Sequence, residues 1–316
     1  MAKPTIRQLE YFLAVAETLH FRKAAERLNV SQPTLSDQIK ELEYRLGVIL
    51  LERSRQAVQL TSVGEDLLER ARYLLRDLDD LCDAAKSAKG MLGGRLRLGV
   101  APTVGPYLLP HVIPLLHQKY PKLKLHIRED RARALEQSLR EGLHDLVLTA
   151  LPVEDDSFQS KVLYEEPLFI GMSREHRLAD KEVITPEDLK NEEVLSLGVG
   201  HRLFEQIQRL CLELGALVQA DYEGTSLDTL RQMVGMKMGI SFFPRLYVRS
   251  EMVNDPQVVA RPIRMKAASR QIGLVWRNNS PRSSDFETFG NDVLRGIRDQ
   301  VDHDFMTLND TKCPNP

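Results

Sequence analysis

The sequence is poor in cysteine, with Cys82, Cys211 and Cys313 as the three examples among 316 residues. They lie far apart and form no Cys-x-x-Cys pair, so no zinc site is expected. The histidines are equally scattered, and the chain has no phosphate-binding P-loop, nucleophile elbow or zinc-protease motif. We therefore expect no metal, no cofactor and no catalytic residue, and do not expect an enzyme.

Long hydrophobic runs are also missing. No apolar segment approaches the length of a membrane span, and the amino terminus has no apolar signal core, so we expect a cytoplasmic protein with no membrane partner. A hydrophobic content of 42% and a charged content of 28% describe a globular protein, and the length suffices for two or three domains. The net charge of −2 argues against non-specific coating of nucleic acid, but allows a small basic surface on one domain.

The most informative stretch that is present covers residues 24–36. Ala24 and Ala25 are small enough for another helix to pack closely against them. After a turn, the hydroxyl of Ser31 would cap a second helix, and Pro33 in the first turn of that helix costs no intrahelical hydrogen bond. This pattern predicts a helix-turn-helix. Gly47 is expected to end the second helix, and Thr61 to cap the next long helix.

The side chains left on the outer face of the second helix are short and form hydrogen bonds, which suits base edges and phosphates in a major groove. Residues 50–55 and 56–60 fit the two strands of a wing, which would reach phosphates or the minor groove. The motif alone leaves an ordinary helical hairpin open, but the helical apolar spacing over residues 5–21 and the wing favour a DNA-binding domain. The expected DNA-binding residues are Arg22, Ser31, Gln32, Pro33, Thr34, Ser36, Gln38, Lys40, Arg53 and Arg55.

A long helix is expected over residues 62–88, because its apolar residues recur alternately four and three positions apart. They are Leu67, Ala71, Leu74, Leu78, Leu81 and Ala85. Such a heptad seam favours dimerisation, which a helix-turn-helix needs in order to read two half-sites. The alternative is an amphipathic helix that packs on its own domain. Three glycines within residues 89–94 then predict a hinge.

Beyond the hinge, strands alternate with helices, which predicts parallel sheets in two α/β lobes. Strands are expected at residues 95–100, 123–128, 146–149, 167–171, 194–197, 218–222, 239–244 and 271–276. Helices are expected at residues 104–120, 132–141, 202–214, 227–238 and 286–301, with a capped helix start at 185–189. The last strand is expected to cross back to the first lobe.

This order of elements resembles the LysR-type transcriptional regulators over nearly the whole chain. The resemblance is carried by residues 9–12, 24–25, 30–36, 46–48 and 60–61. It implies an α/β fold class with an N-terminal all-α winged helix-turn-helix, a long linker helix and a two-lobed regulatory domain like a periplasmic binding protein. The implied boundaries are 1–61 for the DNA-binding domain, 62–90 for the linker, 91–302 for the regulatory domain and 303–316 for a disordered tail.

The resemblance also implies partners: double-stranded DNA with an imperfect inverted repeat, a second copy in a homodimer or homotetramer, RNA polymerase, and a small-molecule effector between the lobes. The expected effector-binding residues are Thr103, Val104, Gly200, His201, Arg202, Thr225 and Ser226. Arg202 at the start of a helix would make an anion site for a carboxylate or phosphate group. It is equally compatible with a plain salt bridge to a neighbour such as Glu205.

Within the family, the regulatory part most resembles the peroxide-sensing OxyR branch, through residues 102–110, 200–201 and 225–231. The resemblance places Arg202 where that branch has its peroxidatic cysteine, and an arginine forms neither a sulfenic acid nor a disulfide. It matches Cys211 to the resolving cysteine, Thr103 to one peroxide-site threonine and Ala132 to a second. Cys211 is thus either an unconventional redox residue or a small core residue. A solute-binding or enzymatic α/β protein with an unrelated N-terminal bundle is the remaining alternative.

Overall fold

The computed structural model describes residues 3–53, 58–87 and 94–300. The chain divides into two compact units, Met1–Ala85 and Lys86–Pro316. Arg55, most of the predicted glycine hinge and the predicted tail lie outside the described residues.

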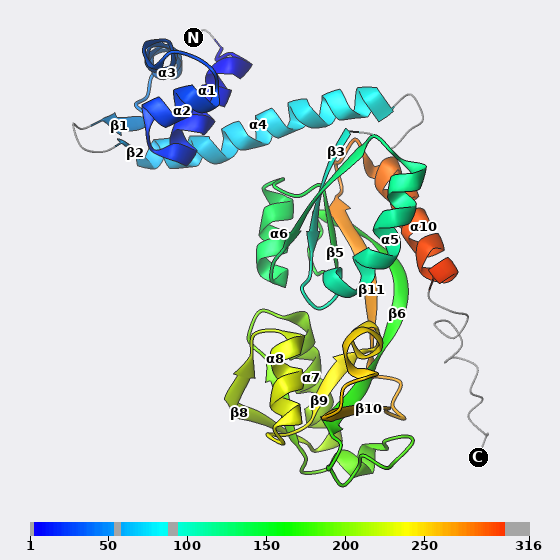
Figure 1. Cartoon of the computed structure of the whole chain (residues 1–316). Coiled ribbons are helices and arrows are strands. Elements are labelled where there is room, and N and C mark those ends of the chain that lie inside the picture. Colours follow the sequence, from blue (N-terminus) through cyan, green and yellow to red (C-terminus); the bar gives the residue numbers. More distant parts are fainter. Residues whose placement is uncertain (1–2, 54–57, 88–93, 301–316) are drawn as a thin grey trace. The chain divides into compact units, whose positions relative to one another are not determined.

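The first unit starts with a cluster of helices, followed by a two-stranded ribbon and a long helix (Figure 1). The predicted helix signals are confirmed: the Ser31 hydroxyl accepts a hydrogen bond from the Thr34 N–H at 3.2 Å, and Gly47 ends the same helix with a φ of 70°. The Thr61 hydroxyl accepts the Gly64 N–H at 2.9 Å where the long helix begins. The elements are α1 (Ile6–Thr18), α2 (Phe21–Arg27), α3 (Gln32–Leu46), β1 (Leu51–Arg53), β2 (Val58–Leu60) and α4 (Ser62–Ser87).

The inner face of α3 anchors it in the core of this unit. Leu35, Ile39 and Leu42 are fully buried, and their spacing of three and four residues places them on one side of the helix. Ala24 and Ala25 are buried in the same cluster, as their small size predicts. The polar side of α3 is therefore left on the outside.

The second unit is built on a mixed sheet, so the prediction of purely parallel sheets is wrong. β3 pairs in parallel with β4 and β5, whereas β11 runs antiparallel to both β5 and β6. β5 and β6 therefore run in the same direction, and β11 (Ser269–Arg277), which lies between them, runs in the opposite direction and makes the sheet mixed. The elements of this part are β3 (Gly94–Val100), α5 (Gly105–Lys119), β4 (Leu123–Glu129), α6 (Ala132–Arg140), β5 (Leu146–Leu151) and β6 (Phe158–Ser173).

β6 is far longer than the short strand predicted at 167–171, and it passes through both lobes (Figure 1). Its first part pairs with β11, and its last part pairs with β9 and β10. The pairing of β11 with β5 confirms that the late strand crosses back to the first lobe. Two separate buried clusters fill the two lobes.

The second lobe differs from the prediction in three details. The helix start at 185–189 is a single 3-10 turn, α8 ends three residues before the predicted position, and β10 is not predicted. Lys237, with a φ of 64°, cannot continue α8. Its elements are η1 (Pro186–Leu189), β7 (Glu193–Leu197), α7 (Arg202–Leu214), β8 (Leu217–Gly224), α8 (Leu227–Gly235), β9 (Ser241–Pro244), α9 (Arg245–Tyr247), η2 (Val248–Met252) and β10 (Val258–Pro262). The chain then returns to the first lobe with β11 (Ser269–Arg277) and α10 (Ser283–Gln300).

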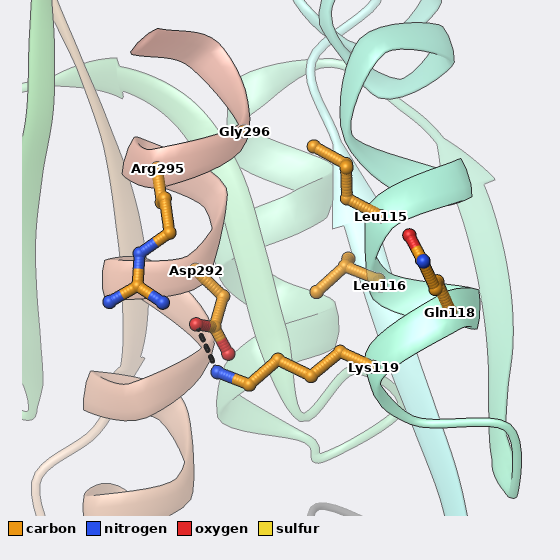
Figure 2. A pocket seen from close by; sticks show the side chains of 7 residues that line it. All are labelled: Leu115, Leu116, Gln118, Lys119, Asp292, Arg295 and Gly296. Atoms are coloured by element: carbon orange, nitrogen blue, oxygen red, sulfur yellow. Dashed lines mark hydrogen bonds and ion pairs between the residues drawn. The ribbon is translucent and has the colours of Figure 1, made fainter. Parts of the chain in front are cut away.

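The closing helix α10 packs on α5 in the first lobe (Figure 2). A Cβ on Gly296 would lie 2.9 Å from the Leu115 side chain, so the two helices approach closely at this glycine. A hollow of about 270 Å³ lies beside it, where Lys119 and Asp292 form an ion pair at 2.5 Å. None of the predicted site residues lines this hollow.

Candidate functional site

The outer face of α3 and its start carry the polar side chains that the sequence analysis selects. The residues at the helix start, with Lys40 further along, are exposed, whereas Ser36 and Gln38 are half-buried. The hydroxyls of Ser31 and Thr34 lie 2.8 Å apart, so part of their hydrogen-bonding capacity is used within the helix start. The exposed residues at the helix start are Ser31, Gln32, Pro33 and Thr34.

The same face is less basic than its predicted residues suggest. Lys40 lies 3.6 Å from Asp37, an exposed acidic residue that the sequence analysis leaves out. Arg22 pairs with Glu26 at 3.0 Å on α2. Exposed ion pairs of this kind are worth little in water, so both cations can exchange their carboxylates for phosphates.

Two other predicted DNA contacts, Gln38 and Arg53, lie in different surroundings. The Gln38 amide oxygen accepts a hydrogen bond from the Gln8 side chain at 3.3 Å, so Gln38 partly serves the packing of α3 against α1. Arg53 lies on β1, but its side chain is outside the described residues. The wing itself is present as the antiparallel pair of β1 and β2.

The heptad seam of α4 divides into two halves. Ala71 is buried in the core of the first unit, as the alternative of an amphipathic helix on its own domain requires. Further along, Leu74 is 59% exposed and Leu81 is 64% exposed. The second half of the seam therefore presents apolar side chains to the outside.

The turn before α7 is tied to the start of α6, in the other lobe, by hydrogen bonds to two of its carbonyls. The Ala132 N–H donates to the Gly200 carbonyl at 3.3 Å, and the Arg131 guanidinium donates to the Val199 carbonyl at 3.2 Å. Gly200 has a φ of 96°, a conformation that favours glycine, and a Cβ there would lie 3.3 Å from the Arg131 side chain. The turn before α7 is thus shaped to lie against α6.

Arg202 completes this junction with its side chain. One of its terminal nitrogens lies 2.5 Å from the Glu136 carboxylate of α6, and the other donates to the Pro152 carbonyl. The salt bridge that the sequence leaves open therefore exists, but with Glu136 rather than with Glu205. Glu136 could not be found from sequence, because it lies 66 residues from Arg202 on another helix.

His201 precedes Arg202 and is buried, with 5% of its surface exposed. Its Nε2 atom has no hydrogen-bond partner among the described residues. Burial, and next the nearby Arg131 charge, lower the pKa of His201, while Glu223 opposes the shift. The imidazole is therefore neutral near pH 7 and leaves an unpaired polar atom beside the start of α7.

Thr103 is already engaged by a buried ion pair. Arg270 on β11 lies 2.8 Å from Glu166 on β6, and both side chains are almost completely buried. Arg270 also donates to the Thr103 hydroxyl at 2.9 Å and to its carbonyl at 2.8 Å. Glu166 accepts the Leu246 N–H at 2.9 Å, so this pair joins the start of α5 to both long strands and to α9. Neither Glu166 nor Arg270 is among the site residues predicted from the sequence.

The remaining predicted effector residues have different surroundings. Val104 is buried in the core of the first lobe. Ser226 caps α8 by accepting the Thr229 N–H at 3.2 Å, whereas Thr225 is exposed. The described contacts do not join these residues to Arg202, so the seven predicted positions do not form one connected group.

A cavity of about 330 Å³ lies next to Arg202, between α7 and the first residues of β11. It is bordered by arginines and glutamates alike, so its walls do not carry a single sign of charge. Its polar lining includes Arg202, Glu205, Gln206, Arg209, Glu213 and Arg270.

Cys211 lies inside the core of the second lobe, with 1% of its surface exposed. Burial raises the pKa of its thiol to about 12. A thiol of this kind forms almost no thiolate near neutral pH, and the thiolate is the form that reacts with oxidants. Cys82, by contrast, is exposed on α4.

In the described ranges, no cluster of three or more His, Cys, Asp or Glu side chains has a geometry suited to a metal ion. No helix in those ranges combines the length and the apolar character needed to cross a bilayer.

Comparison with known proteins covers both units. Residues 6–65 match the family described as "Bacterial regulatory helix-turn-helix protein, lysR family", and residues 89–296 match the "LysR substrate binding domain". The chain is 41% identical over 300 residues to the DNA-binding transcriptional dual regulator OxyR of Escherichia coli, which covers 95% of this chain and 97% of that protein. It is 36% identical over 297 residues to a hydrogen peroxide-inducible genes activator of Haemophilus influenzae, which covers 94% and 98% of the two chains.

Solved structures agree with these matches. A full-length OxyR variant from Pseudomonas aeruginosa superposes with a TM-score of 0.75 at 34% identity, covering 93% of this chain and 95% of that one. A hydrogen-peroxide-bound OxyR variant from Corynebacterium glutamicum superposes with a TM-score of 0.67 at 33% identity, covering 95% and 94%.

Proposed function

Because the chain belongs to the LysR family of DNA-binding transcriptional regulators, we propose that it reads an imperfect inverted repeat in double-stranded DNA by inserting α3 of two copies into successive major grooves. The exposed polar face of α3 would contact base edges, and the wing would contact the phosphate backbone or the minor groove. The DNA-binding part would comprise residues 1–61, the linker 62–90 and the regulatory part 91–302. The protein would act in the cytoplasm.

The observation that carries this proposal is the capped start of α3. Its apolar side is fully buried, so the helix is held rigidly, while the side chains of its first turn remain exposed. A rigid helix start with exposed, short polar side chains suits docking on DNA, since phosphate contacts fix its position and base contacts give specificity.

Dimerisation would use the second half of the α4 seam, where Leu74 and Leu81 are exposed. Pairing of two such helices would bury these leucines and bring two copies of α3 to two half-sites. Two such dimers would form a homotetramer, and the DNA-bound assembly would contact RNA polymerase.

A small-molecule effector would act on the regulatory part, at the junction between α6 and α7. The positive end of α7, Arg202 and the unpaired Nε2 atom of His201 support an anionic ligand there. Arg202 is engaged by Glu136 in the structure, so such a ligand would have to take its place. By linkage, the effector changes DNA binding only if it binds one arrangement of the lobes better than another.

Peroxide sensing is the second candidate, and the names of the relatives favour it. In this chain it would have to work without a cysteine at position 202 and with Cys211 buried in the core. We propose that Cys211 has a packing role and that peroxide does not act through it.

The DNA-binding proposal is tested by selecting sites from a pool of random duplexes with the full-length chain. We expect enrichment of an inverted repeat whose half-site centres lie about one helical turn, roughly 10 base pairs, or a multiple of it apart. Enrichment of unrelated sequences, or none at all, would contradict the proposal and favour the solute-binding or enzymatic alternative.

A further inference from the structure

We propose that the effector is a small carboxylate that competes with Glu136 for Arg202. In the structure the Glu136 carboxylate pairs with the Arg202 guanidinium, and the ligand would act by displacing that carboxylate. This inference rests on the proposed function and deepens it, because it names the chemical class of the ligand and the side chain with which the ligand competes.

The ion pair between Arg202 and Glu136 joins the two lobes and is only partly buried. Arg202 is the first residue of α7 and Glu136 lies in the middle of α6, so the pair links the two lobes. The nitrogen–oxygen distance is 2.5 Å, and the two side chains are 23% and 25% exposed. A pair at this depth is screened less than a surface pair, yet it stays open enough to exchange partners.

The Arg202 guanidinium has an N–H group that makes no hydrogen bond within the described part of the chain. Its Nη1 donates to the Pro152 carbonyl and its Nη2 contacts Glu136, but its Nε has no partner among the described residues. A guanidinium binds a carboxylate best through two parallel hydrogen bonds. A free carboxylate can adopt that geometry, whereas Glu136 contacts Arg202 through one carboxylate oxygen, Oε1.

Positive groups surround the junction between α6 and α7. The amino end of α7 and Arg131 contribute positive charge, and the buried His201 has an unpaired Nε2. Two other carboxylates lie nearby without pairing with Arg202 in the structure: Glu223 lies against Gly198, and Glu205 lines the cavity beside Arg202. Glu136 is therefore the carboxylate that neutralises Arg202 directly, and a ligand that replaces it restores the same balance of charge.

Displacement of Glu136 would have a structural consequence. The ion pair links α6 and α7 in addition to the hydrogen bonds that the Ala132 N–H and the Arg131 guanidinium donate to carbonyls of the preceding turn. When the ligand takes Arg202, α6 loses this link, and the lobes become freer to shift about β6 and β11. A ligand that binds only this released form shifts the population of the protein toward that form.

The test measures succinate binding to the full-length chain by isothermal titration calorimetry. Glu136→Gln removes the competing charge, and we expect it to bind succinate roughly tenfold more tightly than the natural chain, a typical size for such coupling. Glu141→Gln, which removes a carboxylate at the far end of α6 and outside the cavity beside Arg202, is the matched control and should leave the affinity unchanged. Adding Arg202→Gln to Glu136→Gln should abolish the gain.

The outcomes separate this inference from the proposed function. Equal succinate affinity for the natural chain and Glu136→Gln overturns the inference, and so does a gain that survives Arg202→Gln. Tighter binding of inorganic phosphate in Glu136→Gln, without a change for succinate, overturns the carboxylate assignment. DNA binding by the same preparations is measured in parallel. If the chain binds DNA but Glu136→Gln does not change the succinate affinity, the inference alone is rejected. If the chain does not bind DNA, the proposed function is rejected.

Discussion

At the scale of single residues, the surroundings of Cys211 decide what chemistry it can perform. Its thiol is buried in the core of the second lobe, and burial raises its pKa to about 12. We predict that in the native protein Cys82 is alkylated by iodoacetamide at neutral pH while Cys211 is not, as followed by mass spectrometry. Rapid alkylation or peroxide oxidation of Cys211 in the folded chain would contradict the packing role; denatured protein, in which both react, is the control.

The same burial has a consequence for stability at alkaline pH. In the unfolded chain this thiol ionises near its ordinary pKa of 9.0, whereas in the folded chain it keeps its proton up to about 12. Below pH 9 its contribution to the free energy of unfolding is fully present. Between about pH 9 and 12 the unfolded state loses the proton first, so this contribution is lost as the pH rises. Cys211→Ala would remove the pH-dependent part.

Ser31 combines two roles that substitution can separate. Its hydroxyl caps α3, so we predict that Ser31→Ala lowers the free energy of unfolding by about 1 kcal/mol, measured by urea denaturation. Ser31→Asp retains a capping oxygen and should keep the stability, but its charge should weaken DNA binding. Equal stability of Ser31→Ala and the natural chain would contradict the capping role.

Sequence reasoning reached these residues because their signals are local. A hydroxyl or glycine at a helix end acts on atoms within four positions, so Ser31, Gly47 and Thr61 could be assigned directly. The partners of Arg202 and Thr103 could not, because Glu136 and Arg270 lie 66 and 167 residues away. Ion pairs between distant elements depend on the fold, which composition and spacing do not encode.

At the scale of elements, α4 shows how a single periodic pattern can serve two surfaces. The heptad seam continues past the core of the first unit, and its exposed part holds Leu74 and Leu81. We predict that Leu74→Asp together with Leu81→Asp converts the protein to monomers, because each charge would have to be buried in the helix pair. Size-exclusion chromatography with light scattering measures this, and Arg70→Asp on the same helix is the control.

A protein that stays dimeric with both aspartates in place would contradict the role of the α4 seam. Loss of the dimer in Arg70→Asp as well would indicate a general effect of charge on this helix, and would equally contradict it.

The strands show where periodicity fails as a guide. The part of β6 before Pro167 contains Lys161, Glu165 and Glu166, so only the apolar stretch at 167–171 resembles a strand in the sequence. β6 is a strand along its whole length because β11 pairs with it from Phe158 to Pro167, and β9 and β10 pair with the rest. The sheet is mixed because β11 runs antiparallel to both β5 and β6. Pairing with a distant strand therefore decides both features that the sequence analysis missed.

At the scale of the whole molecule, the order of the parts was the most predictable feature. The winged helix-turn-helix, the long helix and the two lobes all follow from successive local patterns, and the family match covers both units. The junction of the lobes was the least predictable, because it depends on how α6 and α7 meet. An arginine at the start of α7 indicates an anion, but only the structure identifies Glu136 as the group that it holds.

The measurement that tests the central claim most directly is a DNase footprint of the full-length chain on the DNA upstream of its own gene. We predict two protected half-sites with the natural chain and loss of protection with Gln32→Ala combined with Thr34→Ala, since both side chains lie at the exposed start of α3. We further predict that hydrogen peroxide leaves the footprint unchanged. Protection that survives the double substitution, or a complete lack of protection by the natural chain, would contradict the account of α3 as the DNA-reading helix.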